Sequence, residues 1–258
     1  SRIPCDYRWG IQKKILAELV NTFGGKFKEV IVGGAAFNKD AEAFFRKIGF
    51  PFTVGYGMTE CAPIIAYAPW DETRLYSCGK ATPGMEIKID SSDPVNIPGE
   101  ILCKGKNVML GYYKNQEATN SSFTSDGWMR TGDVGVIDKD GFLYIRGRSK
   151  SMILGPSGQN IYPEEIESSI NNMPYVIESL VVEDYGILQA LVYPDFEQAE
   201  SDGLSHADLE RKMEENIASV NEELPNYCKI ASTKIFPEEF EKTPKKSIKR
   251  FLYQRTQD

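Results

Sequence analysis

Several short stretches of this sequence place glycine beside hydroxyl or carboxylate side chains, where a small polar ligand can approach the backbone. The clearest is GYGMTE at residues 55–60. Tyr56, with Gly57 beside it, has room to lay its ring on a nucleotide base. Thr59 offers a hydroxyl to a phosphate oxygen, and Glu60 offers the carboxylate oxygens that Mg²⁺ prefers. A plain turn does not require this order of side chains, so the stretch indicates a nucleotide and magnesium site.

Two further stretches carry the same kind of signal. VIVGGAAF brings Gly33, Gly34 and Ala35 to the end of a predicted strand, where a flat ligand can approach the bare backbone. A tight strand-to-helix turn explains these residues equally well. WMRTGDVG presents Asp133, whose two carboxylate oxygens match the two hydroxyls of a ribose. Taken alone, such a turn is more often structural.

Positive charge and an open loop follow one another after residue 146. GRSK supplies the guanidinium of Arg148 and the ammonium of Lys150. GQNIYPEEIE then begins with an open loop at Gly158 and continues into a helix with acidic first turns. Taken alone, the acidic face of that helix is ordinary solvation.

The stretch EKTPKKSIKR, residues 241–250, holds five cations around Ser247. Two interpretations are open. The stretch is either the part of a site that reaches a phosphate, or the start of a basic helix exposed to water.

The elements that must position these residues fall into two kinds. Apolar residues recur at helical spacing over residues 11–23, and a second helix begins after Asn38. Short buried strands at 28–34 and 51–57 follow the two helices. This alternation predicts a parallel α/β section. From 84 to 147, short strands between glycine and proline turns predict an antiparallel, barrel-like section.

After Arg148 the pattern changes to a small α+β domain. It is expected to contain a helix at 163–171, two strands, a helix capped by Ser205 and Asp208, a strand near 233–237 and a final helix. The lone histidine, His206, lies in the exposed first turn of the capped helix, so we do not expect a catalytic base there. The sequence therefore predicts two domains, 1–148 and 149–258.

Composition narrows the class of protein. A chain of 258 residues with 41% hydrophobic content can build two cores, and the net charge of −7 argues against nucleic acid as a partner. Five scattered cysteines without a C-x-x-C pair indicate a reducing compartment. No leader or apolar run of membrane-spanning length is visible. We therefore expect a soluble, cytoplasmic protein, with peripheral contact to a membrane left open.

Together, and in this order, the motifs GGA, YGMTE, GEILCKG…MLGYY, RTGD and GRSKSMI…GQNIYPEEIE resemble the adenylate-forming superfamily, most closely its long-chain fatty acyl-CoA synthetases. The resemblance covers about residues 11 to 255. It implies the carboxyl-terminal half of a large AMP-binding domain followed by a small, mobile α+β lid domain. It also implies that a carboxylate attacks ATP to give an acyl-adenylate, which coenzyme A then converts to a thioester. ATP or AMP, Mg²⁺, coenzyme A and a fatty acid are the implied ligands.

The resemblance also assigns roles by position. Residues 33–35 border the adenine and acyl pocket, Tyr56 stacks on adenine, Thr59 contacts the α-phosphate, Glu60 holds the metal and Asp133 binds ribose.

At the end of the first domain, Arg148 lies beside the ribose site, and the next two site residues belong to the second domain. Lys150 is the hinge about which the small domain rotates, and Gly158 borders the pantetheine tunnel.

Two departures from the family pattern stand out. The Ser/Thr/Gly-rich loop with Pro-Lys that cradles the β- and γ-phosphates has no match, so the resemblance implies an amino-terminal part missing from this piece, which alone should not turn over. The family also runs Thr-Pro-Thr-Gly-Lys-Ile-x-Arg near its end. Its catalytic lysine aligns with Ser247, and a one-residue slip would give the role to Lys246.

Three functions therefore stay open. The leading one is an acyl-CoA synthetase. The others are a carboxylate-adenylating enzyme that loads a carrier protein, and a non-catalytic protein that binds AMP or an acyl-adenylate. Ser247 and the missing phosphate loop favour the last of these.

Overall fold

The computed structural model describes residues 5–34, 37–155, 158–243 and 247–254, with side chains from residue 10 onward. The chain forms two compact units, Ser1–Ile145 and Arg146–Asp258. The predicted division after residue 148 stays a prediction. None of the described helices is long and apolar enough to cross a bilayer.

The first unit begins with two helices and two strands in alternation. They are α1 (Cys5–Thr22), β1 (Val30–Val32), α2 (Lys39–Ile48) and β2 (Phe52–Val54). Strands β1 and β2 pair in parallel, which confirms the predicted parallel section. The Asn38 side chain accepts the Ala41 N–H and caps α2, as expected. Helix α1 begins several residues before the apolar pattern that predicted it.

The predicted strand at 51–57 is in fact two strands in different sheets. After β2, the Gly55 N–H bonds to Val32 O at 2.8 Å, and the chain then leaves the parallel ladder. Strand β3 (Tyr56–Gly57) pairs antiparallel with β4 (Ile64–Tyr67), which pairs with β5 (Lys80–Ala81). The short 3₁₀ turn η1 (Thr59–Cys61) connects β3 to β4.

A four-stranded sheet completes the first unit. Its strands β6 (Met85–Asp90), β7 (Gly99–Gly105), β8 (Met129–Ile137) and β9 (Leu143–Arg148) are neighbours in that order. The β6–β7 and β7–β8 ladders are antiparallel, as predicted, whereas closure into a barrel stays a prediction. A helix that the sequence did not indicate, α3 (Gln116–Ser121), lies between β7 and β8.

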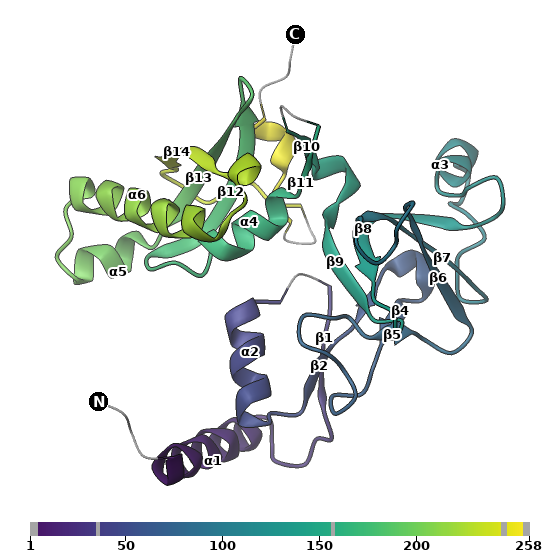
Figure 1. The fold of residues 1–258 in the computed structure, drawn as a ribbon, viewed down its shortest axis with the longest axis horizontal. Helices are drawn as coiled ribbons and strands as arrows, with labels where there is room; N and C mark the ends of the chain where they lie inside the picture. Colours follow the sequence, from purple (N-terminus) through teal and green to yellow (C-terminus); the bar gives the residue numbers. More distant parts are fainter. Residues whose placement is uncertain (1–4, 35–36, 156–157, 244–246, 255–258) are drawn as a thin grey trace. The chain divides into compact units, whose positions relative to one another are not determined.

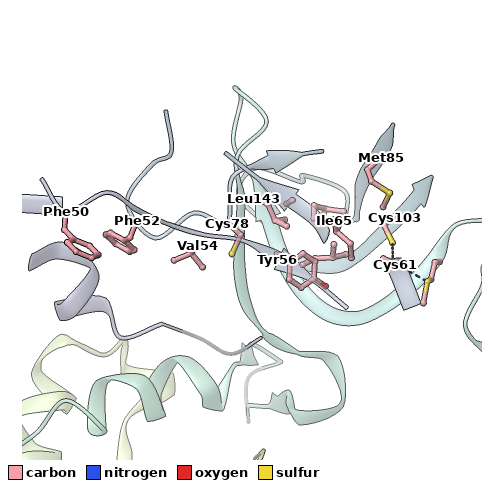
Figure 2. Packing of buried hydrophobic residues seen from close by; sticks show 14 of the residues in the cluster. Phe50, Phe52, Val54, Tyr56, Cys61, Ile65, Cys78, Met85, Cys103 and Leu143 are labelled. Atoms are coloured by element: carbon pink, nitrogen blue, oxygen red, sulfur yellow. Dashed lines mark hydrogen bonds between the residues drawn. The ribbon is translucent and has the colours of Figure 1, made fainter. Parts of the chain in front are cut away.

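The core of the first unit joins the two kinds of sheet. Figure 2 shows Phe50, Phe52, Val54 and Tyr56 in the same cluster as Cys61, Ile65, Cys103 and Leu143. The Cys61 and Cys103 sulfurs lie 3.6 Å apart, and both side chains are fully buried. The buried side chains beneath the η1 turn are therefore closely packed.

The second unit is a three-stranded sheet with helices. After the last residues of β9 it continues with η2 (Ser149–Ser151) and the short pair β10 (Ile153–Leu154) and β11 (Asn160–Ile161). Then follow α4 (Pro163–Ile170), β12 (Val176–Asp184), β13 (Ile187–Pro194), α5 (Phe196–Ser201), α6 (His206–Glu223), η3 (Asn226–Cys228) and β14 (Ile230–Ile235). The order is β12–β13–β14, with the second pair parallel.

Helix α6 forms as the sequence predicted. Ser205 and Asp208 make the reciprocal capping box, and the apolar stripe from Leu209 to Val220 is buried. Helices α4 and α6 pack on the same face of the sheet (Figure 1). The His206 side chain is 69% exposed, as expected.

The predicted final helix is wrong. Within the described residues after β14, the only helical piece is the 3₁₀ turn η4 (Arg250–Leu252). Phe236 and Phe240 stack at 4.9 Å between ring centroids, and Tyr253 packs edge-on against both. These rings pack the segment against the second face of the sheet. This packing, and not a helix, holds the segment in place.

Candidate active site

The structure brings together two motifs that lie 77 residues apart. The Tyr56 hydroxyl donates to Asp133 Oδ2 at 2.7 Å. Tyr56 is only 7% exposed, and burial, followed by the charge of Asp133, raises the pKa of its hydroxyl. The hydroxyl therefore stays protonated and orients the Asp133 carboxylate. The Tyr56 ring itself is packed in the core. Stacking of this ring on adenine stays a prediction.

The predicted metal ligand lies in the η1 turn. Thr59 is exposed, and Glu60 is half-buried with its Oε1 accepting a hydrogen bond from the Tyr112 hydroxyl at 2.9 Å. In the part of the chain that the structure describes, no group of three or more His, Cys, Asp or Glu side chains could enclose a metal ion. A single carboxylate suits Mg²⁺ that is bound mainly through phosphate oxygens. Glu60 fits that role.

The glycines of the site differ in what they contribute. Gly33 and Gly34 follow β1 directly, and Gly34 takes φ +91°, a conformation that favours glycine. Gly57 is required by space, because a Cβ there would lie 2.0 Å from the Pro63 carbonyl oxygen. Ala35 lies outside the described residues.

Three predicted site residues belong to the second unit. Arg148, at the end of β9, and Lys150, within η2, are both exposed. Gly158 takes φ +82° between β10 and β11, and its N–H donates to Gly155 O at 2.9 Å. Their roles as ribose neighbour, hinge and tunnel border stay predictions.

The basic stretch forms an antiparallel stem. The Thr243 N–H donates to Ser247 O at 2.8 Å, and the Lys249 N–H donates to Glu241 O at 2.8 Å. Lys249 Nζ also lies 3.0 Å from Glu241 Oε2. Ser247 is exposed at the end of the described stem, and Lys246 lies outside the described residues. The alternative of a basic helix start is therefore wrong for the stem.

Sequence reasoning missed the ion pair that fixes this stem. Arg250 binds both oxygens of Glu167 at 2.8 Å and donates to Val181 O at the same distance. The Val181 N–H in turn donates to Glu167 Oε1 at 2.6 Å. Glu167 is thus buried and paired, whereas the acidic helix face was expected to be solvated. The spacing of acidic residues in α4 gave no signal for a partner this far along the chain.

Sequence reasoning also gave no role to Tyr112, although the residue stands in the MLGYY motif. Its contact with Glu60 becomes visible only when β7 and its following loop are placed beside η1.

Comparison with known families identifies both parts of the chain. Residues 11–113 match the family described as AMP-binding enzyme, and residues 150–256 match the AMP-binding enzyme C-terminal domain. The two matches together span most of the chain.

Individual relatives agree with the family. The chain is 33% identical over 174 residues to a long-chain-fatty-acid–CoA ligase of Mycobacterium bovis, which covers 67% of this chain and 27% of that protein. It is 37% identical over 169 residues to a 2-succinylbenzoate–CoA ligase of Bacillus subtilis, covering 64% of this chain and 34% of that protein.

A solved structure shows the same fold. The o-succinylbenzoate CoA synthetase of Bacillus subtilis, in complex with its acyl-adenylate intermediate, matches with a TM-score of 0.73 and 27% identity. The match covers 95% of this chain and 50% of that chain. This chain thus spans about half of the solved structure that it matches. The motif constellation, the fold and both family matches show that the chain belongs to the AMP-binding, adenylate-forming superfamily.

Proposed function

We propose that the protein containing this chain is an AMP-forming acid–thiol ligase. A carboxylate attacks the α-phosphorus of ATP, the bond to the β-phosphate oxygen breaks, and acyl-adenylate and pyrophosphate form. The coenzyme A thiolate then attacks the acyl carbon, and AMP leaves. The observation that carries the proposal is the 2.7 Å contact between Tyr56 and Asp133, which joins the adenine and ribose motifs in one place.

The residues of the first unit act on the nucleotide. Asp133 accepts hydrogen bonds from the ribose hydroxyls, and the Tyr56 hydroxyl holds its carboxylate in place. Thr59, exposed at the start of η1, donates to the α-phosphate. Glu60 would hold Mg²⁺, and bound Mg²⁺ would neutralise charge on the phosphates as it builds up.

The residues of the second unit act on the acid and the thiol. Lys150 serves as the hinge and Gly158 leaves space for pantetheine. Lys246 supplies the cation between the carboxylate and the α-phosphate. The support for this role is the family pattern, in which Lys246 follows the Thr243–Pro244 pair and directly precedes Ser247.

A long-chain fatty acid is the acid we propose. The support is the name of the Mycobacterium bovis relative, whereas other relatives are named for succinylbenzoate and 2-methylpropanoate. We therefore expect palmitate to be turned over faster than either of these acids.

Binding without catalysis is the second candidate, and Ser247 favours it. The hydroxyl of Ser247 stands where the family pattern has its lysine, and a serine cannot neutralise charge between two anionic groups. In that case the protein would bind AMP or an acyl-adenylate and release no pyrophosphate.

Pyrophosphate release by the whole protein, with ATP, Mg²⁺, coenzyme A and palmitate, tests the choice. We expect Lys246→Ala to slow adenylation by roughly 100- to 1,000-fold, the usual loss when a group that stabilises charge in the transition state is removed. The neighbouring Lys245→Ala is the matched control and should change the rate little. Thioester formation from added acyl-adenylate should survive in both. If neither the wild type nor Lys246→Ala releases pyrophosphate and Ser247→Lys does, the natural protein is a binder.

A further inference from the structure

The loop after β7 lies against the turn that carries Thr59 and Glu60. The Asn107 side-chain amide donates to Cys61 O at 2.6 Å and to Ile64 O at 3.3 Å. The Met109 N–H donates to Glu60 O at 2.8 Å. The middle and the end of the η1 turn are therefore bonded to one neighbouring segment.

The same segment also reaches the Glu60 side chain. The Tyr112 hydroxyl donates to Glu60 Oε1 at 2.9 Å across 52 positions of sequence. Tyr112 itself is fixed near helix α3, since its N–H donates to Thr119 Oγ1 at 2.9 Å and its carbonyl accepts the Asn115 N–H at 3.2 Å. The hydroxyl is thus presented to the carboxylate from an anchored backbone.

We propose that Tyr112 is a positioning residue for the Glu60 carboxylate. The proposal rests on the proposed function, in which Glu60 holds Mg²⁺. A glutamate on the surface of a turn has several rotamers, and fixing one of them costs conformational entropy. A hydrogen bond to a carboxylate oxygen meets part of that cost before the metal arrives, as the outer partners of metal ligands do.

The chain offers a matched control in the next residue. Tyr113 is 88% exposed, and its ring lies 5.3 Å from the Lys114 ammonium. Tyr112→Phe and Tyr113→Phe remove the same atom from adjacent positions. Only the first removes a hydrogen bond to Glu60.

The experiment measures Mg²⁺ affinity rather than turnover alone. ATP binding to the whole protein is followed by calorimetry at a series of Mg²⁺ concentrations, without acid or coenzyme A, and the Mg²⁺ dependence of pyrophosphate exchange is measured in parallel. We expect Tyr112→Phe to weaken the apparent Mg²⁺ affinity by roughly 10-fold. Tyr113→Phe should leave it unchanged, and neither should change the affinity for ATP at saturating Mg²⁺.

A Glu60→Gln background separates positioning from a general effect on folding. If Tyr112 acts through Glu60, Tyr112→Phe should cause no further loss of Mg²⁺ affinity in that background. Wild-type affinity in Tyr112→Phe, or an equal loss with and without the Glu60 carboxylate, would overturn the inference while leaving the ligase proposal intact. Mg²⁺-independent ATP binding by the wild type would overturn the inference too, whereas a wild type that shows no pyrophosphate exchange with its acid would overturn the ligase proposal.

Discussion

Removing the Arg250 guanidinium should destabilise the second unit more than removing any exposed arginine. The side chains of Arg250 and Glu167 are only 15% and 11% exposed, and two parallel 2.8 Å bonds join them. Burial alone would lower the pKa of Arg250, but the hydrogen bonds and charge of Glu167 raise it overall. Arg250→Leu therefore leaves a buried carboxylate without its cation, which costs about 3–5 kcal/mol of unfolding free energy.

Native-state hydrogen exchange of the β12 amides is the assay, because it reports the opening of this unit alone. A loss of about 3–5 kcal/mol corresponds to exchange faster by roughly two to three and a half powers of ten.

The control is Arg211→Leu in the same unit. Arg211 pairs with Asp208, and the two side chains are 68% and 42% exposed. Such a surface pair contributes about 0–1 kcal/mol. The reasoning fails if β12 exchanges no faster in Arg250→Leu than in Arg211→Leu.

Two further predictions concern the first unit. Gly57→Ala should prevent the unit from folding normally, because the new Cβ would lie 2.0 Å from Pro63 O. The control Gly10→Ala in α1 meets nothing within 4 Å and should stabilise the helix by about 0.5–1 kcal/mol. Thermal unfolding of the two variants checks this, and equal midpoints would contradict it. The hydrogen bond to Glu29, followed by burial, raises the pKa of Tyr67 from 10.0 to about 12. Since the folded state holds this proton more tightly, the stability from the bond should be complete below pH 10 and lost as the pH rises to about 12. The stability difference between wild type and Tyr67→Phe, measured by urea unfolding, should shrink over that range, and a constant difference would refute the assignment.

Local signals in the sequence predicted local structure well. Asn38 before α2 and the Ser205–Asp208 box before α6 are both caps whose partners lie three residues away. Hairpin strands β6 to β9 were visible from their turns for the same reason. Such interactions are decided within one turn of chain, so the sequence contains all of their parts.

Interactions between distant segments could not be predicted from the sequence. The chain leaves the parallel ladder after Gly55 because β3 pairs with β4. No α-helix forms among the described residues after β14, because Phe236 and Phe240 pack that segment against the sheet. Helix propensity is a weak preference that such packing overrides.

In the candidate site, too, the local motifs were predicted and the contacts between them were not. The resemblance gave the residue types of the YGMTE and RTGD motifs, but not the Tyr56–Asp133 contact that joins them. Glu60 was predicted without its partner Tyr112, since nothing in the spacing of 52 residues indicates a hydrogen bond.

The Arg250–Glu167 pair also sets an order of events during synthesis. The carboxylate leaves the ribosome 83 residues ahead of its guanidinium, an interval of about 4–17 s at roughly 5–20 residues per second. During that interval the residues of helix α4 and strand β12 have been made, but packing them around Glu167 would bury a charge with no counter-ion from Arg250. We therefore expect this side of the nascent sheet to stay hydrated until residue 250 is made, so that Arg250 sets when the unit closes.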